Sequence, residues 1–400
     1  MTNNAFEVDA KGLQEILGAV PTWRHALELV ANVFDEYKGY NDRLKPSACH
    51  VTATREGRKT RLLVSDDGAG FENVEDIWTF FGTTGKRHTA DVSGRFNAGD
   101  KQLFAIATEA SIHTGMHQVL FHNGIRTHTK FRAENKYTQG TRISALLTIT
   151  KDEHDSLVDM LERVHPPNRL TYIVNGNEVM PRARMHTVRV TLPTVILTEG
   201  ALRTSTRKTA VEVYAPVDGE AYLYELGMPI CPIDNGFAYS LDVQQKIPLP
   251  LSRDMVSKSY MDRLIGSVVD AAAQDGVMLV TESEQGAEFL KPAMDWIRNP
   301  EALEATTTSV YGSDAVRWSS DPQANAIAAG QGRVVVSRNT FSPSTVKRME
   351  SQGIMPTSRE EFGEIVDELR DKQGERIIPD AIVFVCENCG HKNELSQGGF

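Results

Sequence analysis

The first part of the chain alternates between apolar spacing typical of helices and apolar spacing typical of strands. An apolar run from Ala26 to Phe34 follows Pro21-Thr22-Trp23, which predicts a helix with Thr22 as its N-cap. Residues 48–55 and 59–65 have strand composition on either side of Glu56-Gly57-Arg58, a pattern typical of a hairpin. The sequence therefore predicts a helix followed by an antiparallel pair of strands.

A second hairpin is predicted for 117–131 around Asn123-Gly124, and another strand begins at Thr141. After residue 187, most of the predicted elements are strands. The remaining predicted elements are helices at 152–164, 259–274 and 358–370, and strands at 170–174, 187–197, 211–215, 221–226 and 237–247.

Three polar residues interrupt the apolar surface of the first helix. At 100° per residue, Glu28, Asn32 and Asp35 fall in one narrow sector, and apolar residues cover most of the rest. A helix buried on nearly all sides would point a carboxylate and an amide at one place. The same spacing is also typical of a thin solvent-facing stripe on a surface helix, so spacing alone does not decide.

The second strand ends in Asp66-Asp67-Gly68-Ala69-Gly70. Two glycines in such a turn permit positive φ and let the backbone approach a ligand closely. An Asp-Gly turn is also common in ordinary loops. The turn alone therefore indicates no function.

Residues 71–99 are rich in glycine, threonine and basic residues, a composition that favours a mobile lid. From Lys101 the sequence is helical in character as far as Ala110. Free backbone N–H groups near Gly99 and Lys101 would then face phosphate oxygens, because the first N–H groups of a helix have no partner within it.

Three stretches follow one another along the chain: the Glu28–Asp35 helix, the Asp66-x-Gly68-x-Gly70 box and Gly94–Lys101. In this order they resemble the Bergerat ATP-binding fold. The fold belongs to the GHKL superfamily of gyrase, heat-shock protein 90, histidine kinases and MutL. The resemblance implies an α+β protein with an N-terminal α/β sandwich, in which a mixed sheet has helices on one face and a glycine-rich lid. A strand-rich α/β second domain and a small C-terminal region follow.

The resemblance also implies an adenine site. Asp66 would accept a hydrogen bond from the adenine 6-amino group, beside Gly68 and Gly70. Thr141 matches the Thr of a Gly-Thr pair that supports adenine recognition in the superfamily. By itself, Thr141 is only a β-branched residue in a strand.

The phosphate site is implied by the same resemblance. Glu28 would be the general base and Asn32 would hold Mg²⁺, with Asp35 in the same site. The lid departs from the superfamily pattern, because Asn97 replaces a glycine and Asp100 stands beside the lysine. The lid residues expected at the phosphates are Thr84, Lys86, Gly94, Gly99 and Lys101.

One loop of the second domain resembles a known phosphate-sensing loop. Lys246-Ile-Pro-Leu-Pro-Leu-Ser-Arg253 is similar to the catalytic loop of heat-shock protein 90, with Arg253 as the residue that reaches the γ-phosphate. Ser257 occupies the place of a family Gln. Lys246 alternatively resembles the lysine that gyrase and MutL send from their second domain. An exposed loop with ordinary charges is the other interpretation.

Length and composition narrow the class of protein. The chain has 400 residues, with 43 basic and 53 acidic residues and a formal charge of −10. This balance does not support generic attraction to DNA or anionic membranes, although a local basic patch remains open. The sequence has no apolar run long enough for a membrane span and no basic, apolar leader. Four cysteines do not make a disulfide scaffold, and we expect a cytoplasmic protein.

Three regions are predicted: an ATP-binding domain at 1–180, a second α/β domain at 181–284, and a linker with a small C-terminal region at 285–400. Residues 285–345 mix short helical patches with loop-like stretches, which indicates a loop-rich linker or a small subdomain. Cys386-Glu-Asn-Cys389 resembles one knuckle of a zinc ribbon, but a structural zinc site needs four ligands and no second Cys pair is present.

The functional hypothesis is Mg²⁺-dependent ATP hydrolysis that drives lid closure and domain rearrangement, as in heat-shock protein 90-like and MORC-like ATPases. The resemblance alone implies a homodimer, and the sequence does not name the client. One alternative is a nucleic-acid-associated ATPase of MutL, topoisomerase or phage type. Another is a nucleotide-binding module without turnover.

Overall fold

The computed structural model divides the chain into two compact units. One unit comprises residues 1–185, 193–232 and 240–256, and the other comprises 186–192, 233–239 and 257–400. The residues described are 12, 15, 17–39, 43–79, 99–122, 124–132, 139–198, 201–233, 237–249, 256–280, 290–371, 381–385 and 392–396. The predicted boundaries at 180 and 284 remain a prediction.

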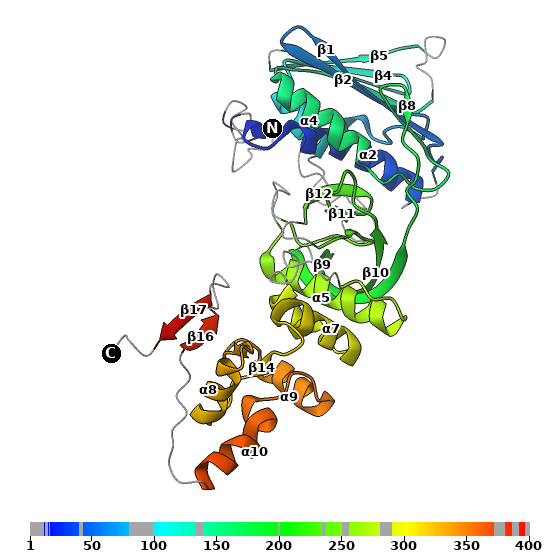
Figure 1. Cartoon of the computed structure of the whole chain (residues 1–400). Coiled ribbons are helices and arrows are strands. Elements are labelled where there is room, and N and C mark those ends of the chain that lie inside the picture. Colours follow the sequence, from blue (N-terminus) through cyan, green and yellow to red (C-terminus); the bar gives the residue numbers. More distant parts are fainter. Residues whose placement is uncertain are drawn as a thin grey trace. The chain divides into compact units, whose positions relative to one another are not determined.

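The first unit is built around an eight-stranded mixed sheet (Figure 1). Its strand order is β5-β4-β3-β6-β2-β1-β7-β8. The β1–β7 pair is parallel, and the other neighbours are antiparallel. The strands are β1 (Ala48–Glu56), β2 (Lys59–Asp66), β3 (Glu109–Thr114), β4 (His117–His122), β5 (Ile125–Lys130), β6 (Thr141–Leu147), β7 (Thr171–Val174) and β8 (Asn177–Glu178).

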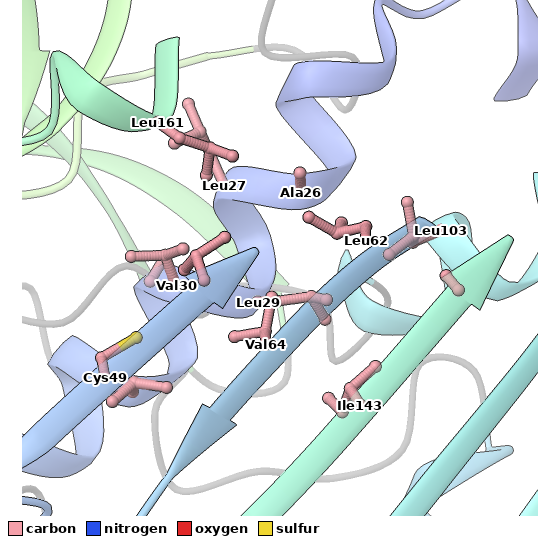
Figure 2. Packing of buried hydrophobic residues seen from close by; sticks show 14 of the residues in the cluster. Ala26, Leu27, Leu29, Val30, Cys49, Leu62, Val64, Leu103, Ile143 and Leu161 are labelled. Atoms are coloured by element: carbon pink, nitrogen blue, oxygen red, sulfur yellow. The ribbon is translucent and has the colours of Figure 1, made fainter. Parts of the chain in front are cut away.

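One face of this sheet carries the hydrophobic core. Successive side chains of a strand point to opposite faces, and on β2 the alternate residues Leu62 and Val64 are buried. Figure 2 shows them packed with Ile143 of β6 and Leu29 of α2 (Thr22–Lys38). Burial of each such side chain contributes about 1.5–3 kcal/mol. The core therefore fixes how α2 is rotated on the sheet.

Helices α2, α3 (Gly99–Ile106) and α4 (Lys151–Glu162) cover this buried face. The predicted α+β class, with a mixed sheet and helices on one face, is confirmed. The prediction that Thr22 caps α2 is wrong, because Pro21 is the N-cap and no side chain makes a capping hydrogen bond there. Thr22 is instead buried in the first turn.

The predicted helix from Lys101 to Ala110 is too long. The Thr108 N–H donates to the Leu146 carbonyl of β6 at 2.9 Å, so the chain leaves α3 and enters β3 at Glu109. Pairing with β6 overrides the local helical preference of this segment.

A second sheet has the order β12-β11-β13-β10-β9. Its strands are β9 (His186–Thr198), β10 (Ala201–Tyr214), β11 (Tyr222–Glu225), β12 (Met228–Pro232) and β13 (Ser240–Val243). The strand predicted at 211–215 is the end of the longer β10. The strand predicted at 237–247 is shorter, because the Ile247 N–H donates to the Glu225 carboxylate at 2.7 Å instead of to a neighbouring strand.

The second unit is mainly helical among its described residues, so the interpretation of 285–345 as a loop-rich linker is wrong. Three of its helices begin with a capping residue followed by proline, at Asn299-Pro300, Asp321-Pro322 and Ser342-Pro343. Its elements are α5 (Lys258–Gln274), η4 (Pro292–Trp296), α7 (Pro300–Tyr311), β14 (Val316–Arg317), α8 (Pro322–Gly330), β15 (Val335–Val336), α9 (Pro343–Gln352), α10 (Ser358–Asp371), β16 (Ala381–Val385) and β17 (Lys392–Ser396).

In the described part of the chain, no helix combines the length and apolar character needed to cross a bilayer.

Gly140 is a sensitive point of the first sheet. Its φ is +94°, and an added Cβ would lie 1.9 Å from the Asp66 carbonyl oxygen. We expect Gly140→Ala to lower the free energy of unfolding by more than about 4 kcal/mol, as measured by urea denaturation. Gly176→Ala is the control, because Gly176 has φ +85° but no atom within 4 Å of the added Cβ. It should cost only about 1–2 kcal/mol, and equal losses in both variants would show that the contact with Asp66 does not matter.

Candidate functional site

The turn after β2 holds a buried carboxylate. The Gly68 N–H donates to Asp66 Oδ1 at 2.8 Å, and the Thr141 backbone makes a second hydrogen bond to the carboxylate. Burial, with a smaller contribution from the Glu36 carboxylate, raises the pKa of Asp66 to about 6. Asp66 is therefore ionised at neutral pH but poorly solvated.

The neighbouring Asp67 has a structural task. Its carboxylate accepts the Ser47 and Ala48 N–H groups at 2.7 and 3.0 Å, and Gln139 donates to its carbonyl at 3.0 Å. Burial acts to raise the pKa of Asp67, but the hydrogen bonds from Ser47 and Ala48 hold it below its usual range. The two adjacent aspartates therefore differ, because Asp67 anchors the turn and Asp66 is the less solvated of the pair.

Gly70 is required by close packing of the same turn. Its φ is +73°, and an added Cβ would lie 2.5 Å from Thr114 Oγ1. That hydroxyl accepts the Phe71 N–H at 3.0 Å. Arg43 supports the turn from the other side, with its guanidinium 2.5 Å from the Gly70 carbonyl oxygen. The second glycine of the Asp-x-Gly-x-Gly box thus lets the turn fold against β3.

Helix α2 presents a row of polar side chains, Glu28, Asn32 and Glu36, which we call the polar row. These residues are spaced by four positions and lie on one side of the helix, over about 12 Å of its length. Glu28 and Asn32 are half-buried, although most of the helix around them is buried. The carboxylate of Glu36 acts electrostatically on Asp66. The polar row therefore runs from Glu28 toward the turn that holds Asp66.

A surface hollow lies at the Glu28 end of the polar row. Its walls come from α2 and the segment before it, from α3 and from β12, and Arg24 donates to the Ile230 carbonyl at 2.9 Å across it. The lining residues are Val20, Trp23, Arg24, His25, Leu27, Glu28, Ala31, Gln102, Met228, Pro229 and Ile230.

The sequence reasoning missed Glu36 and Gln102. Glu36 follows Asn32 by one turn on the same side of the helix, so its spacing was a usable signal. Gln102 had no such signal, because only the fold brings α3 beside α2.

Other predicted site residues occupy defined places. Asp35 is buried at 2% exposure on α2, and Thr141 on β6 pairs with Asp66. Gly99 begins α3, where Lys101 is buried at 3% exposure. Gly68 lies in the turn after β2. The roles of these residues remain predictions.

Lys246 belongs to the same compact unit as α2. It is 1% exposed, and its carbonyl accepts the Thr194 hydroxyl at 2.8 Å. The interpretation as an ordinary exposed loop is therefore wrong for Lys246. Thr84, Lys86, Gly94 and Arg253 lie outside the described residues.

The donor set of the polar row fits Mg²⁺. The amide of Asn32 and the carboxylate of Glu28 are hard oxygen donors one turn apart, and Mg²⁺ is commonly held by one or two protein oxygens together with substrate phosphates. No cluster of three or more His, Cys, Asp or Glu side chains that would bind a metal occurs among the described residues. Cys386 and Cys389, the possible zinc ligands, lie between β16 and β17 and outside the described residues.

Comparison with known proteins shows a distant structural likeness. No family model matches the chain, and no curated protein matches it in sequence. The chain is similar to the ATPase region of Saccharomyces cerevisiae topoisomerase II bound to ICRF-187 (dexrazoxane), at 11% identity and a TM-score of 0.34. The match covers 52% of this chain and 62% of that one. A likeness this remote carries no conclusion about activity.

From the buried charge of Asp66 we predict how the free energy of unfolding depends on pH. A carboxyl group with a higher pKa in the folded than in the unfolded state costs stability once it ionises, so its cost develops between about pH 4 and pH 6 and persists above. We expect Asp66→Asn to raise the free energy of unfolding above pH 6 by about 1–3 kcal/mol, since one pKa unit corresponds to about 1.4 kcal/mol. The difference should shrink below about pH 4.

Asp67→Asn is the matched control and should act in the opposite direction. Because the pKa of Asp67 is lowered, its ionised form stabilises the fold at neutral pH, and this contribution is lost as the pH falls through the folded-state pKa. Urea denaturation across the pH range measures both variants. If both substitutions destabilise equally at neutral pH, Asp66 does not carry a buried charge.

Proposed function

We propose that the chain binds ATP with Mg²⁺ and hydrolyses it, and that this cycle closes a lid and rearranges the second domain. The observation that supports the proposal best is the buried carboxylate of Asp66 in a glycine turn, with the polar row of α2 leading toward it. The order of these parts along the sequence matches the GHKL superfamily.

Asp66 is suited to recognise adenine. One of its oxygens is held by the Gly68 N–H, and an ionised carboxylate has capacity for further donors. A hydrogen bond from the adenine 6-amino group to this charged acceptor contributes about 1.5–3 kcal/mol. A base with a carbonyl at that position would leave the carboxylate desolvated, with no donor beyond the Gly68 and Thr141 backbone groups.

Glu28 is the proposed general base. It lines the hollow at the far end of the polar row from Asp66, and neither Asn32 nor Asp66 is among the residues that line this hollow. The proposal places the phosphates of a nucleotide bound at Asp66 toward this end of the row. Its carboxylate takes a proton from the attacking water, a role worth about 10²–10⁴ in rate. Asn32 lies between the two ends and would hold Mg²⁺, which neutralises phosphate charge when bound.

Cationic groups complete the proposed phosphate site. Lys101, Lys246 and Arg253 offset the charge that develops at the γ-phosphoryl group. Thr84, Lys86, Gly94 and Gly99 belong to the lid that closes over the phosphates. The buried positions of Lys101 and Lys246 fix these two side chains in place.

Coupling to the second sheet is proposed to run through α2. Arg24 hydrogen-bonds the Ile230 carbonyl of β12, and Met228, Pro229 and Ile230 share the hollow with Glu28. A shift of α2 on nucleotide binding would therefore change the contacts of β12. The proposed cycle is that of a conformational ATPase of heat-shock protein 90 or MORC type, working as a homodimer on a client.

Two other functions remain as alternatives. A nucleotide-binding module without turnover would have no use for a base at Glu28, so the Glu28 carboxylate in the hollow favours hydrolysis. A nucleic-acid-associated ATPase shares every feature of the nucleotide site and differs only in its partner.

The base assignment predicts a specific loss in Glu28→Gln. This substitution keeps the size of the side chain but cannot accept the proton, so turnover should fall by about 10²–10⁴ while ATP still binds. Phosphate release measures turnover, and a fluorescent ATP analogue measures affinity.

Asp155→Asn is the control, because it removes the same charge from an exposed carboxylate that pairs with Lys151 at 3.3 Å on α4. It should leave both turnover and affinity unchanged. Wild-type turnover in Glu28→Gln would eliminate Glu28 as the base.

A further inference from the structure

The segment from Glu109 to Arg132 is basic within an acidic protein. It contains one acidic residue, Glu109, against three Arg or Lys residues and four of the 11 histidines of the chain. Most of it folds into β3, β4 and β5, with β5 at the end of the strand order. The positive charge of the segment is therefore concentrated at one edge of the first sheet.

Three basic residues of β5 form a straight row, which we call the basic strip. Arg126, His128 and Lys130 occupy alternate positions of the strand and point to the same face, roughly 6.6 Å apart. All residues of β5 are exposed. Lys130 lies opposite His117 of β4, so this imidazole extends the strip across the hairpin.

Neighbouring rings hold the basic strip in place. The Arg126 guanidinium lies 4.1 Å from the centre of the Trp78 ring, and the His128 ring is 5.7 Å from the same centre. His117 Nδ1 is 2.9 Å from His128 Nε2. Trp78 therefore orders two members of the strip through cation–π and ring contacts without neutralising them.

The charge of the strip is available for a partner. Within the described part of the chain, neither Arg126 nor Lys130 pairs with a carboxylate. Burial lowers the pKa of His117, and the charges of His128 and Lys130 lower it further, which reflects the local excess of positive charge.

We propose that the basic strip binds the phosphate backbone of a nucleic acid, without base specificity. Arg126 and Lys130 are two cations about 13 Å apart along an extended strand, with the His128 imidazole between them, and this arrangement fits a polymer with regularly spaced negative charges. A single phosphorylated side chain would require cations that converge on one point. The strip lies on the face of the sheet that carries the core, because its β4 partners Val119 and Phe121 belong to that core. Binding of nucleic acid there would favour the nucleic-acid-associated class of the proposed ATPase.

A membrane surface fits the strip less well. Binding to an anionic bilayer is strengthened by apolar side chains that insert beside the cations. The exposed apolar residues of this hairpin, Ile125 and Leu120, point to the opposite face of the sheet, because they alternate with the strip residues and their strand partners.

Fluorescence anisotropy with short labelled DNA tests the proposal on the full chain. A single strand and a duplex of equal length are titrated between about 50 mM and 200 mM NaCl. We expect the wild-type protein to bind, and Arg126→Gln/Lys130→Gln to bind about tenfold or more weakly. The slope of log affinity against log salt should fall by about 1.4–1.8, the value expected for two lost phosphate contacts.

Two variants control for charge and folding. Thr127→Glu/Thr129→Glu changes the net charge by the same two units on the opposite face of β5, and it should keep the wild-type salt slope. Arg126→Lys/Lys130→Arg keeps the charge and should restore binding. Melting temperatures establish that each variant is folded, and ATP titration of the same samples reports the nucleotide site separately.

Several outcomes would overturn the proposal. One is that the wild-type protein binds neither DNA. Another is that the strip variant and the opposite-face control lose DNA affinity equally. The third is that the protein binds phosphatidylserine vesicles through the strip and does not bind DNA. If the wild-type protein binds DNA but does not bind ATP, the proposed ATPase is refuted and the proposal for the basic strip still holds.

Discussion

The burial of one negative charge at the end of β2 is the constraint on which the rest of the site depends. Asp66 sits where β2 and β6 lie so close that Gly140 has no room for a side chain. The anchoring hydrogen bonds of the turn go to Asp67, while the Asp66 carboxylate is left desolvated with its pKa raised to about 6. A ligand that brings a hydrogen-bond donor to this carboxylate would offset part of the cost of its burial.

The second determinant is the rotation of α2. Apolar residues such as Leu29 and Val30 pack into the core (Figure 2) and bury most of this helix. The half-buried polar row therefore lies on the one side that the core leaves uncovered. The same helix is tied to β12 through Arg24. The helix whose rotation sets the direction of Glu28 and Asn32 thus also holds β12 near Glu28.

Part of the first sheet could be predicted from the sequence, because β1, β2 and β6 alternate between buried and more exposed residues and the hairpins have clear turn residues. The turn that holds Asp66 could be predicted from its glycines, and Glu28 and Asn32 of the polar row from their helical spacing. The third residue predicted with them, Asp35, is buried, and Glu36 completes the row instead. Features set by long-range pairing could not be predicted from the sequence. Examples are the early end of α3 beside β6 and the position of Gln102 in the hollow. The three helices that begin with proline after residue 299 each have a recognisable capping residue before the proline. These helix starts could have been predicted from the sequence despite the loop-like composition of the region.

Isothermal titration calorimetry of the wild-type protein with ATP and with GTP, both in the presence of Mg²⁺, tests the central claim most directly. Asp66 should accept the 6-amino group of adenine, and guanine presents a carbonyl oxygen there, so ATP should bind more tightly by about 1.5–3 kcal/mol, or roughly 10–150-fold. Equal affinity for the two nucleotides, or no heat with either, would contradict the assignment of Asp66 and the nucleotide site built around it.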